Sequence, residues 1–395
     1  MKLSSSPPLH LTYCLNVHPG ETWRECFNAI RDKALVVRNR VAPNEPFGLG
    51  LRLGRRAAAE LSRDGHLDAF KRFLVEHDIY VFTINGFPYG RFHATSVKQD
   101  VYRPDWRSTR RLSYTTLLAD ILAALLPEGL SGSISTVPGS YKAWANSPAR
   151  VRQVVRHLAR CALHLRHLHE RTGKLLRLAL EPEPDCLLET TEEAIRFFSG
   201  PLIEEGAAEL RRLGVVSADC ESVLRSHIGV CFDTCHLAVQ FENLAESLQR
   251  LRQHGTAIPK IQLSAALQVT IDDASSNVLR LFCDPVYLHQ VKVKGPEGLR
   301  SFNDLNDLLA APPAGQESRI HFHVPLFWPG QPPLQSTVTS LSTGFFRLMA
   351  SGASEHVEIE TYTFDVLPKA IRPGDVIESI AREYAWVLDR LSHKS

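Results

Sequence analysis

The chain has 395 residues, of which 44% are hydrophobic and 22% are charged, as is ordinary for a globular protein. Its formal net charge of +2 gives no reason to expect a polyanionic partner, so we expect no nucleic-acid partner. No apolar run approaches the ~18 residues of a membrane helix, the N-terminus lacks signal-peptide features, and the eight cysteines are scattered with no CxxC pair. We therefore expect a cytoplasmic protein with reduced cysteines.

Segments of strand length alternate along the chain with helical patterns. Their runs are continuously apolar rather than alternating, which is typical of parallel strands buried on both faces. A final helix is expected over residues 377–391. In chain order the strand candidates are Leu11–His18, Phe47–Leu53, Ile79–Phe87, Ser131–Val137, Leu175–Glu181, Ile228–Val239, Pro259–Leu267 and His356–Phe364.

Eight strand–helix units in sequence predict an α/β fold, and most simply a (β/α)8 TIM barrel. An open doubly wound sheet is the alternative, but no GxGxxG follows any strand, which disfavours its dinucleotide-binding form. Residues 268–333 are too many for a loop of a compact barrel, so we interpret them as an insertion after strand 7. The insertion contains a strand of its own at Ile320–Phe327, and we expect one domain over residues 1–395.

Polar side chains stand at the ends of most of these strands. Because the carboxyl ends of barrel strands form one rim, these residues are expected to meet there. Three carboxylates so close together would stay ionised only beside a strong cation, and carboxylates with imidazoles suit Mn²⁺ or Zn²⁺. The rim residues are His18, Asn85, Glu181, Asp233 with His236, Gln262 and Glu360, with His321 and His323 offered by the insertion.

Each of these residues also has a purely structural interpretation. Glu181 begins the stretch Glu181-Pro182-Glu183-Pro184, which is also typical of a solvated strand end, and Asp233 suits the N-cap of a following helix. In an extended strand His321 and His323 point to one side and Phe322 to the other. We expect the apolar side to pack on the barrel rim, so that both imidazoles face the barrel mouth.

The motifs "LALEPEP", "GVCFDTCHLA", "KIQLS" and "VEIET" resemble the strand motifs of the xylose-isomerase-like TIM-barrel superfamily, which includes sugar isomerases, sugar epimerases and endonuclease IV. The resemblance implies that Glu181, Asp233 and Glu360 are metal ligands and that His236 is a further ligand or a substrate contact. On the seventh strand the superfamily has a histidine where this chain has Gln262, so either Gln262 is a weak ligand or the insertion supplies the missing nitrogen.

More narrowly, "HFHVPLF" and "VEIETYTFDVLP" resemble the TIM-barrel family of bacterial ebo gene clusters, labelled metabolite traffic proteins. That resemblance implies a role in the export of metabolite precursors and a functional link to a prenyltransferase-like membrane protein.

The leading functional hypothesis is a metal-dependent isomerase or epimerase of a small sugar-like or carbonyl metabolite. Glu181 and Glu360 would exchange a proton beside the substrate carbonyl, while His18, Asn85, His236, His321 and His323 would bind the substrate. A non-catalytic metabolite-binding or traffic protein is the first alternative. Metal-dependent phosphodiester cleavage, as in endonuclease IV, is the second, although the near-neutral charge disfavours it.

Overall fold

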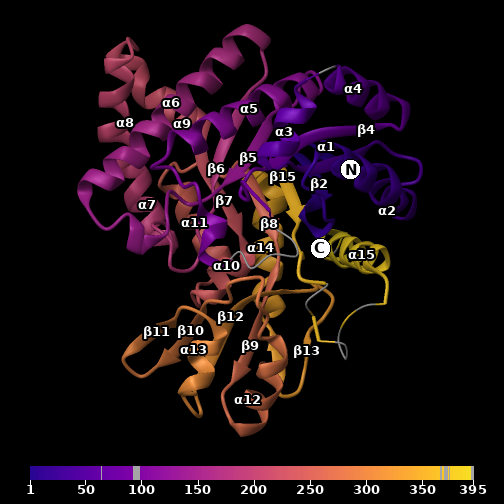
Figure 1. The fold of residues 1–395 in the computed structure, drawn as a ribbon, viewed down its shortest axis with the longest axis vertical. Helices are drawn as coiled ribbons and strands as arrows, with labels where there is room; N and C mark the ends of the chain where they lie inside the picture. Colours follow the sequence, from indigo (N-terminus) through magenta and orange to yellow (C-terminus); the bar gives the residue numbers. More distant parts are fainter. Residues whose placement is uncertain (64, 92–97, 365–366, 369–371, 373, 393–395) are drawn as a thin grey trace.

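The computed structural model describes residues 1–63, 65–91, 98–364, 367–368, 372 and 374–392. Eight strands pair in parallel in chain order and form the upper part of the molecule in Figure 1. Their side chains are almost all buried, as the apolar runs predicted. The strands are β2 (Pro8–Tyr13), β3 (Phe47–Arg52), β4 (Ile79–Asn85), β5 (Gly132–Thr136), β6 (Leu176–Leu180), β7 (Ile228–Asp233), β8 (Lys260–Leu263) and β15 (His356–Ile359).

The ring of strands closes at β2, whose two edges face β15 and β3. β15 pairs with β2 along its length, and a parallel bridge joins Cys14 to Gly50 at the opposite edge. The Thr12 hydroxyl adds two hydrogen bonds there, donating to Gly48 O and accepting from Gly50 N, each at 2.9 Å. A short strand, β1 (Lys2–Ser5), pairs antiparallel with the start of β2. The predicted (β/α)8 barrel is therefore confirmed.

Helices follow every barrel strand, although the seventh is delayed until after the insertion. The last helix packs against α2, which brings the two ends of the chain together in Figure 1. The barrel helices are α1 (Trp23–Ala29), α2 (Leu35–Val41), α3 (Arg55–Leu61), α4 (His66–Glu76), α5 (Thr109–Leu125), α6 (Pro148–Thr172), α7 (Thr191–Ser199), α8 (Pro201–Arg212), α9 (Cys220–His227), α10 (Thr234–Val239), α11 (Leu244–Gln253), α14 (Thr343–Leu348) and α15 (Val376–Ser392).

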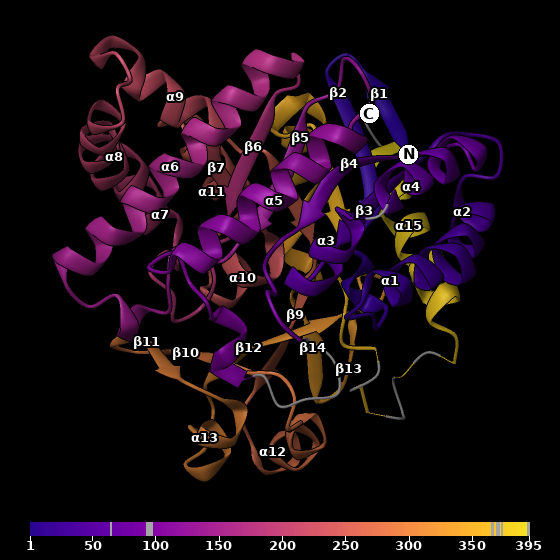
Figure 2. The ribbon, with the colours of Figure 1, turned by 45° about the horizontal axis from the view of Figure 1, so that its top comes forward.

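The insertion forms a second, antiparallel sheet at the carboxyl end of the barrel, seen below it in Figures 1 and 2. β8 leads directly into this sheet through Ser264. The sheet covers Ala265–Ser336, three residues more at each end than the expected 268–333. Its strands are β9 (Ala265–Thr270), β10 (Val291–Gly295), β11 (Gly298–Phe302), β12 (Glu317–Val324), β13 (Gly330–Gln331) and β14 (Leu334–Ser336), with helices α12 (Asp273–Leu279) and α13 (Leu305–Ala310).

The barrel interior differs from the apolar core that its strands predict. Lys260 of β8 and Glu358 of β15 are both fully buried and form an ion pair, with Nζ 2.5 Å from Oε2. Burial lowers the pKa of the Lys260 ammonium, but the neighbouring Glu358 carboxylate outweighs it and raises that pKa. Gly50 leaves room for this pair, because a Cβ there would lie 2.1 Å from Glu358 Oε1.

Candidate metal and substrate site

Three carboxylates meet at the carboxyl end of the barrel. Glu181 follows β6, Asp233 ends β7 and Glu360 follows β15, and one oxygen of each lies within 4.8 Å of the other two. All three residues are buried, with exposures of 3%, 0% and 4%. The strand-end argument thus placed these residues together correctly, although they come from three separate parts of the chain.

The cluster of three carboxylates, Glu181, Asp233 and Glu360, is electrostatically unfavourable without a cation. Burial raises the pKa of Glu181 well above its usual value, and repulsion by Glu360 and Asp233 raises it further. The pKa of Glu360 is raised in the same way, first by burial and then by Asp233. Glu181 Oε2 and Asp233 Oδ2 are buried and have no hydrogen-bond partner. Buried carboxylate oxygens of this kind fit a divalent cation, which would supply both the missing partner and the missing positive charge.

Asp233 also caps the helix that follows it, as its structural interpretation proposed. Its Oδ1 accepts hydrogen bonds from His236 N at 3.0 Å and from Ser264 Oγ at 2.7 Å. The strand that was expected over residues 228–239 therefore ends at Asp233, and α10 begins at the next residue. Asp233 can serve both as a helix cap and as one of the three clustered carboxylates, because the cap uses Oδ1 and leaves Oδ2 without a partner.

Glu360 is held in place by three side-chain amides. Asn16 and Asn85 donate to Oε1 at 2.7 and 3.0 Å, and Gln262 donates to Oε2. Asn85 was expected as a substrate contact, and Asn16 was not identified from the sequence. Its one signal is that it lies between the first strand and His18, near the rim of the barrel.

Gln262 lies beside Glu360 at the carboxylates. Its amide nitrogen donates to Glu360, and its carbonyl oxygen accepts from the thiol of Cys231 at 2.6 Å. An amide binds a cation through its oxygen, and in Gln262 that oxygen is engaged. In this arrangement Gln262 orients Glu360, and its role as a metal ligand stays a prediction.

Three imidazoles lie beside the carboxylates, and each is oriented by a hydrogen bond at Nδ1. His236 bonds Pro182 O at 3.0 Å, His321 bonds Gln290 Oε1 at 2.8 Å and His323 bonds Glu360 O at 2.8 Å. Each acceptor is an oxygen, so each Nδ1 carries the proton and each Nε2 presents a lone pair, as metal-binding histidines do. Nε2 of His321 and Nε2 of His323 are buried without a partner.

The same imidazoles are uncharged at neutral pH. Burial, with the neighbouring imidazoles, lowers the pKa of His236 and of His321 well below the usual value. Burial also lowers the pKa of His323. Possible ligand atoms of Asp233, His236 and His323 lie within 4.8 Å of one another, so the imidazole and carboxylate groups share Asp233.

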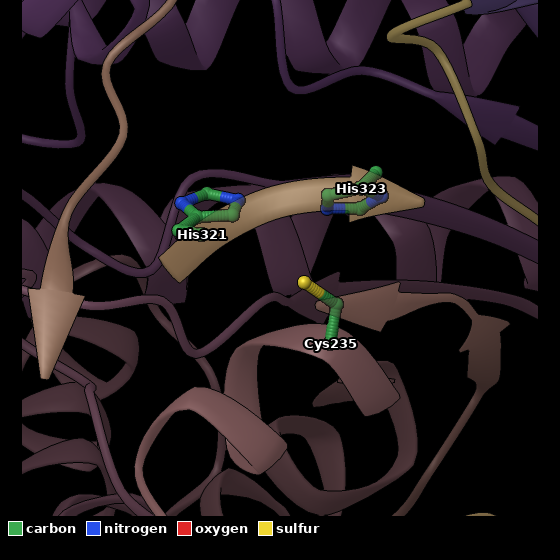
Figure 3. A group of neighbouring side chains, drawn as sticks. All are labelled: Cys235, His321 and His323. Carbon is green, nitrogen blue, oxygen red and sulfur yellow. The ribbon is translucent and has the colours of Figure 1, made fainter. Parts of the chain in front are cut away.

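The insertion delivers His321 and His323 from β12, as expected. Figure 3 shows both rings on this strand, with the Cys235 thiol of α10 facing the space between them. A bulge between Ile320 and His323 interrupts the pairing of β12 with β9. The ring of Phe322 lies 5.2 Å from that of Phe282 in the insertion, and Phe322 belongs to the hydrophobic core that the insertion shares with the barrel.

Glu183 is a site residue that the sequence interpretation missed. It is 5% exposed and accepts a hydrogen bond from the Tyr102 hydroxyl at 2.8 Å. Burial raises the pKa of the Glu183 carboxyl to about 8. Possible ligand atoms of Glu183, His236 and His321 lie within 4.8 Å of one another. Its position two residues after Glu181 was a visible signal for a second carboxylate at this rim.

His18, the expected substrate contact, lies at a separate cavity. The first strand ends at Tyr13, and a turn of helix at Leu15–Val17 stands between that strand and His18. Its Nε2 hydrogen-bonds the Tyr13 hydroxyl at 2.9 Å, and it lines a separate cavity with Arg52 and Cys26.

A pocket opens above the carboxylates and contains about 530 Å³ of empty space, counting the part that is open to solvent. Glu181, Glu183, Glu360, His236 and His321 are among the residues that line it.

The sequence has no match among family models. No curated protein matches it either. Solved structures resemble the chain distantly, among them the IOLI protein with a binding zinc atom, at 13% identity and a TM-score of 0.48 over 97% of this chain and 98% of that one. A D-tagatose 3-epimerase-like protein has 12% identity and a TM-score of 0.48, over 98% and 99% of the two chains. The probable 3-DHS dehydratase AsbF of Bacillus anthracis has 12% identity and a TM-score of 0.45, over 98% and 100%. Likenesses this distant identify neither a substrate nor a reaction for this chain.

Proposed function

We propose that this protein is a metal-dependent isomerase or epimerase that acts on a small carbonyl or sugar-like metabolite at the barrel mouth. One observation carries the proposal: Glu181, Asp233 and Glu360 gather buried carboxylate oxygens within 4.8 Å, and two of these residues have an oxygen with no hydrogen-bond partner. Such a group is costly to bury unless a cation balances it.

The ligand set best suits Mn²⁺ or Zn²⁺. The three carboxylates would hold the ion, and His323 would add a nitrogen through Nε2, which has no partner and belongs to the group with Asp233. When bound, the ion would hold adjacent oxygens of the substrate and polarise its carbonyl.

The protein's own residues provide the proton transfer. Glu181 is suited to remove the proton beside the carbonyl, because its Oε2 is not engaged in a hydrogen bond. Glu360 is held in a constant position by Asn16, Asn85 and Gln262, and burial raises its pKa, so it would begin the reaction protonated. It would then give its proton to the substrate, and the proton that Glu181 has taken would pass to water, after which Glu360 takes up a new proton from water. His236 and His321, uncharged and lining the pocket, would orient the substrate oxygens.

The cellular role is also part of the proposal. A function in the export of metabolite precursors, linked to a prenyltransferase-like membrane protein, is supported by the ebo-type sequence motifs alone. Among the described residues, no helix of the protein itself has the length and apolar character needed to span a bilayer. All eight cysteines are free thiols, which supports our proposal of a reducing, cytoplasmic location.

A non-catalytic metabolite carrier is the second candidate function. The position of Gln262 favours it, because an amide stands where a histidine ligand is expected from the resemblance, and this amide donates to Glu360. A carrier would keep the pocket and bind its ligand without exchanging protons.

Metal analysis combined with solvent exchange tests the proposal. The protein is purified, its metal content is measured, and it is loaded with Mn²⁺ or Zn²⁺ and incubated with a panel of α-hydroxy carbonyl compounds in D2O. We expect about one ion per chain and deuterium incorporation beside the carbonyl, which Glu181→Gln abolishes. Glu76→Gln, at an exposed position at the end of α4, is the control and is expected to leave the exchange unchanged. A metal-loaded protein that binds panel compounds without exchange would favour the carrier.

A further inference from the structure

The pocket above the carboxylates has two chemically different sides. One set of lining residues consists of the carboxylates and imidazoles of the site. The other set, called the wall, consists of side chains of four separate segments, which follow β4, precede α5, precede β10 and follow β15. The wall consists of Phe87, Pro88, Val101, Tyr287, Leu288 and Tyr362.

Part of this wall is a small hydrophobic cluster around Tyr287. Tyr287 packs its ring edge-on against Tyr362, with centroids 5.2 Å apart, and Val101 packs against the same cluster. Phe87 belongs to the main core, and Val101 and Leu288 also pack against that core. The parts of these side chains that face the pocket gain by burying an apolar group of a ligand.

Several donors among the lining residues are already engaged, whereas Asn16 Oδ1, Glu183 Oε2 and His321 Nε2 have no partner. Among the described lining residues, Asn16 and Asn85 donate their amides to Glu360, and the Tyr102 hydroxyl donates to Glu183. The Lys98 ammonium donates to Asp304 Oδ2 at 2.6 Å and to Asp284 O at 3.1 Å. A chain of sugar hydroxyls lying along this wall would lose its hydrogen bonds to water and find few replacements.

From this division we propose that the substrate carries adjacent oxygens at one end and an apolar group of about the size of a phenyl ring at the other. The oxygens lie at the carboxylates and the apolar group lies against the wall of Val101, Tyr287, Leu288 and Tyr362. The substrate class is thus an oxygenated metabolite with an apolar substituent, in preference to an unmodified polyhydroxylated sugar. This inference rests on the proposed function for the location of the reacting end.

A matched pair of diols tests the wall directly. 1-Phenyl-1,2-ethanediol and 1,2-propanediol share the diol and differ in a phenyl ring against a methyl group. Dissociation constants are measured by ligand-observed NMR on the full chain, both metal-free and loaded with Zn²⁺. We expect the phenyl compound to bind at least about tenfold more tightly in both forms, because it buries more apolar surface.

Substitutions locate the effect. Leu288→Asn places a polar amide in the wall and is expected to reduce the preference below about threefold, and Val101→Ser serves the same purpose if Leu288→Asn does not fold. Val75→Asn changes an apolar residue that is 83% exposed on α4, outside the pocket, and is expected to leave the preference intact. A preference that survives both wall substitutions would overturn the inference.

The outcomes separate this inference from the proposed function. Equal affinities for the two diols, or tighter binding of erythritol than of the phenyl diol, would overturn the inference whatever the metal content. A phenyl preference in a protein that binds no metal would support the wall and reject the metal-dependent function. Metal binding without a preference for the phenyl diol would overturn the inference about the wall and leave the proposed function standing.

Discussion

Replacing Glu181 with glutamine distinguishes two roles for this residue, that of a metal ligand and that of a residue that only ends a strand. The two roles predict opposite effects on the stability of the metal-free protein. The pKa of Glu181 is raised well above 4.5, so the folded chain keeps a proton that the unfolded chain has released. Folded-state stability therefore falls as pH rises above 4.5. Repulsion by Glu360 and Asp233 adds to this cost, because both raise the pKa of Glu181 in the same direction as burial.

Glutamine resembles the protonated acid but takes up no proton. We therefore expect Glu181→Gln to stabilise the metal-free protein at pH 7.5 by about 1–3 kcal/mol, the usual cost of a buried polar group without a partner, and to have little effect at pH 4.5. Metal affinity should fall by more than about 100-fold, since even the loss of a residue behind a ligand costs roughly 10–100-fold. Urea unfolding of chelator-treated protein and competition with a chromophoric chelator measure the two effects, with Glu76→Gln as the exposed control. A variant that is less stable at pH 7.5 and binds metal normally would refute this reasoning and make Glu181 a structural residue.

Three further substitutions probe other parts of the protein. Lys260→Met leaves Glu358 buried without its cation, so we expect the unfolding free energy to fall by about 3–5 kcal/mol. Adding Glu358→Met should recover part of this loss. Urea unfolding in which the double variant is no more stable than the single variant would contradict this. His323→Ala removes an Nε2 that has no hydrogen-bond partner. Metal affinity, measured by chelator competition, should fall at least about tenfold. An unchanged affinity would exclude His323 as a metal ligand. Burial raises the pKa of Glu383 from 4.5 to about 7, so stability should fall by about 3 kcal/mol as pH rises through that window. Glu383→Gln should remove this fall, and equal pH slopes for the two proteins would show that Glu383 is not its source.

The order of elements was predictable because buried parallel strands and their helices leave clear patterns in the sequence. The ends of the strands were less so. The apolar run of residues 228–239 was interpreted as one strand, yet it changes into α10 after Asp233, because periodicity alone does not distinguish a buried strand from a short buried helix. The run of residues 259–267 likewise divides at Ser264, where β8 leaves the barrel and enters the insertion.

The residues of the candidate site also divide into those that the sequence predicts and those that it does not. Glu181, Asp233 and Glu360 were predictable because a general rule places strand ends on one rim. Asn16 was not, because its contact with Glu360 depends on how a turn after the first strand folds. The Lys260–Glu358 pair was missed although Glu358 stands two residues before Glu360 and so faces the same side of its strand.

The seam between β2 and β15 joins the beginning of the chain to its end. Asn16 and Glu360, which hydrogen-bond across it, are 344 residues apart. At a synthesis rate of 5–20 residues per second, roughly 17 to 70 s pass between the making of these two residues. Throughout that interval β2 has no β15 to pair with, and the cluster of three carboxylates is missing Glu360. The ribosome therefore completes the candidate site and the barrel at nearly the same moment, and a chain that stops before β15 has neither.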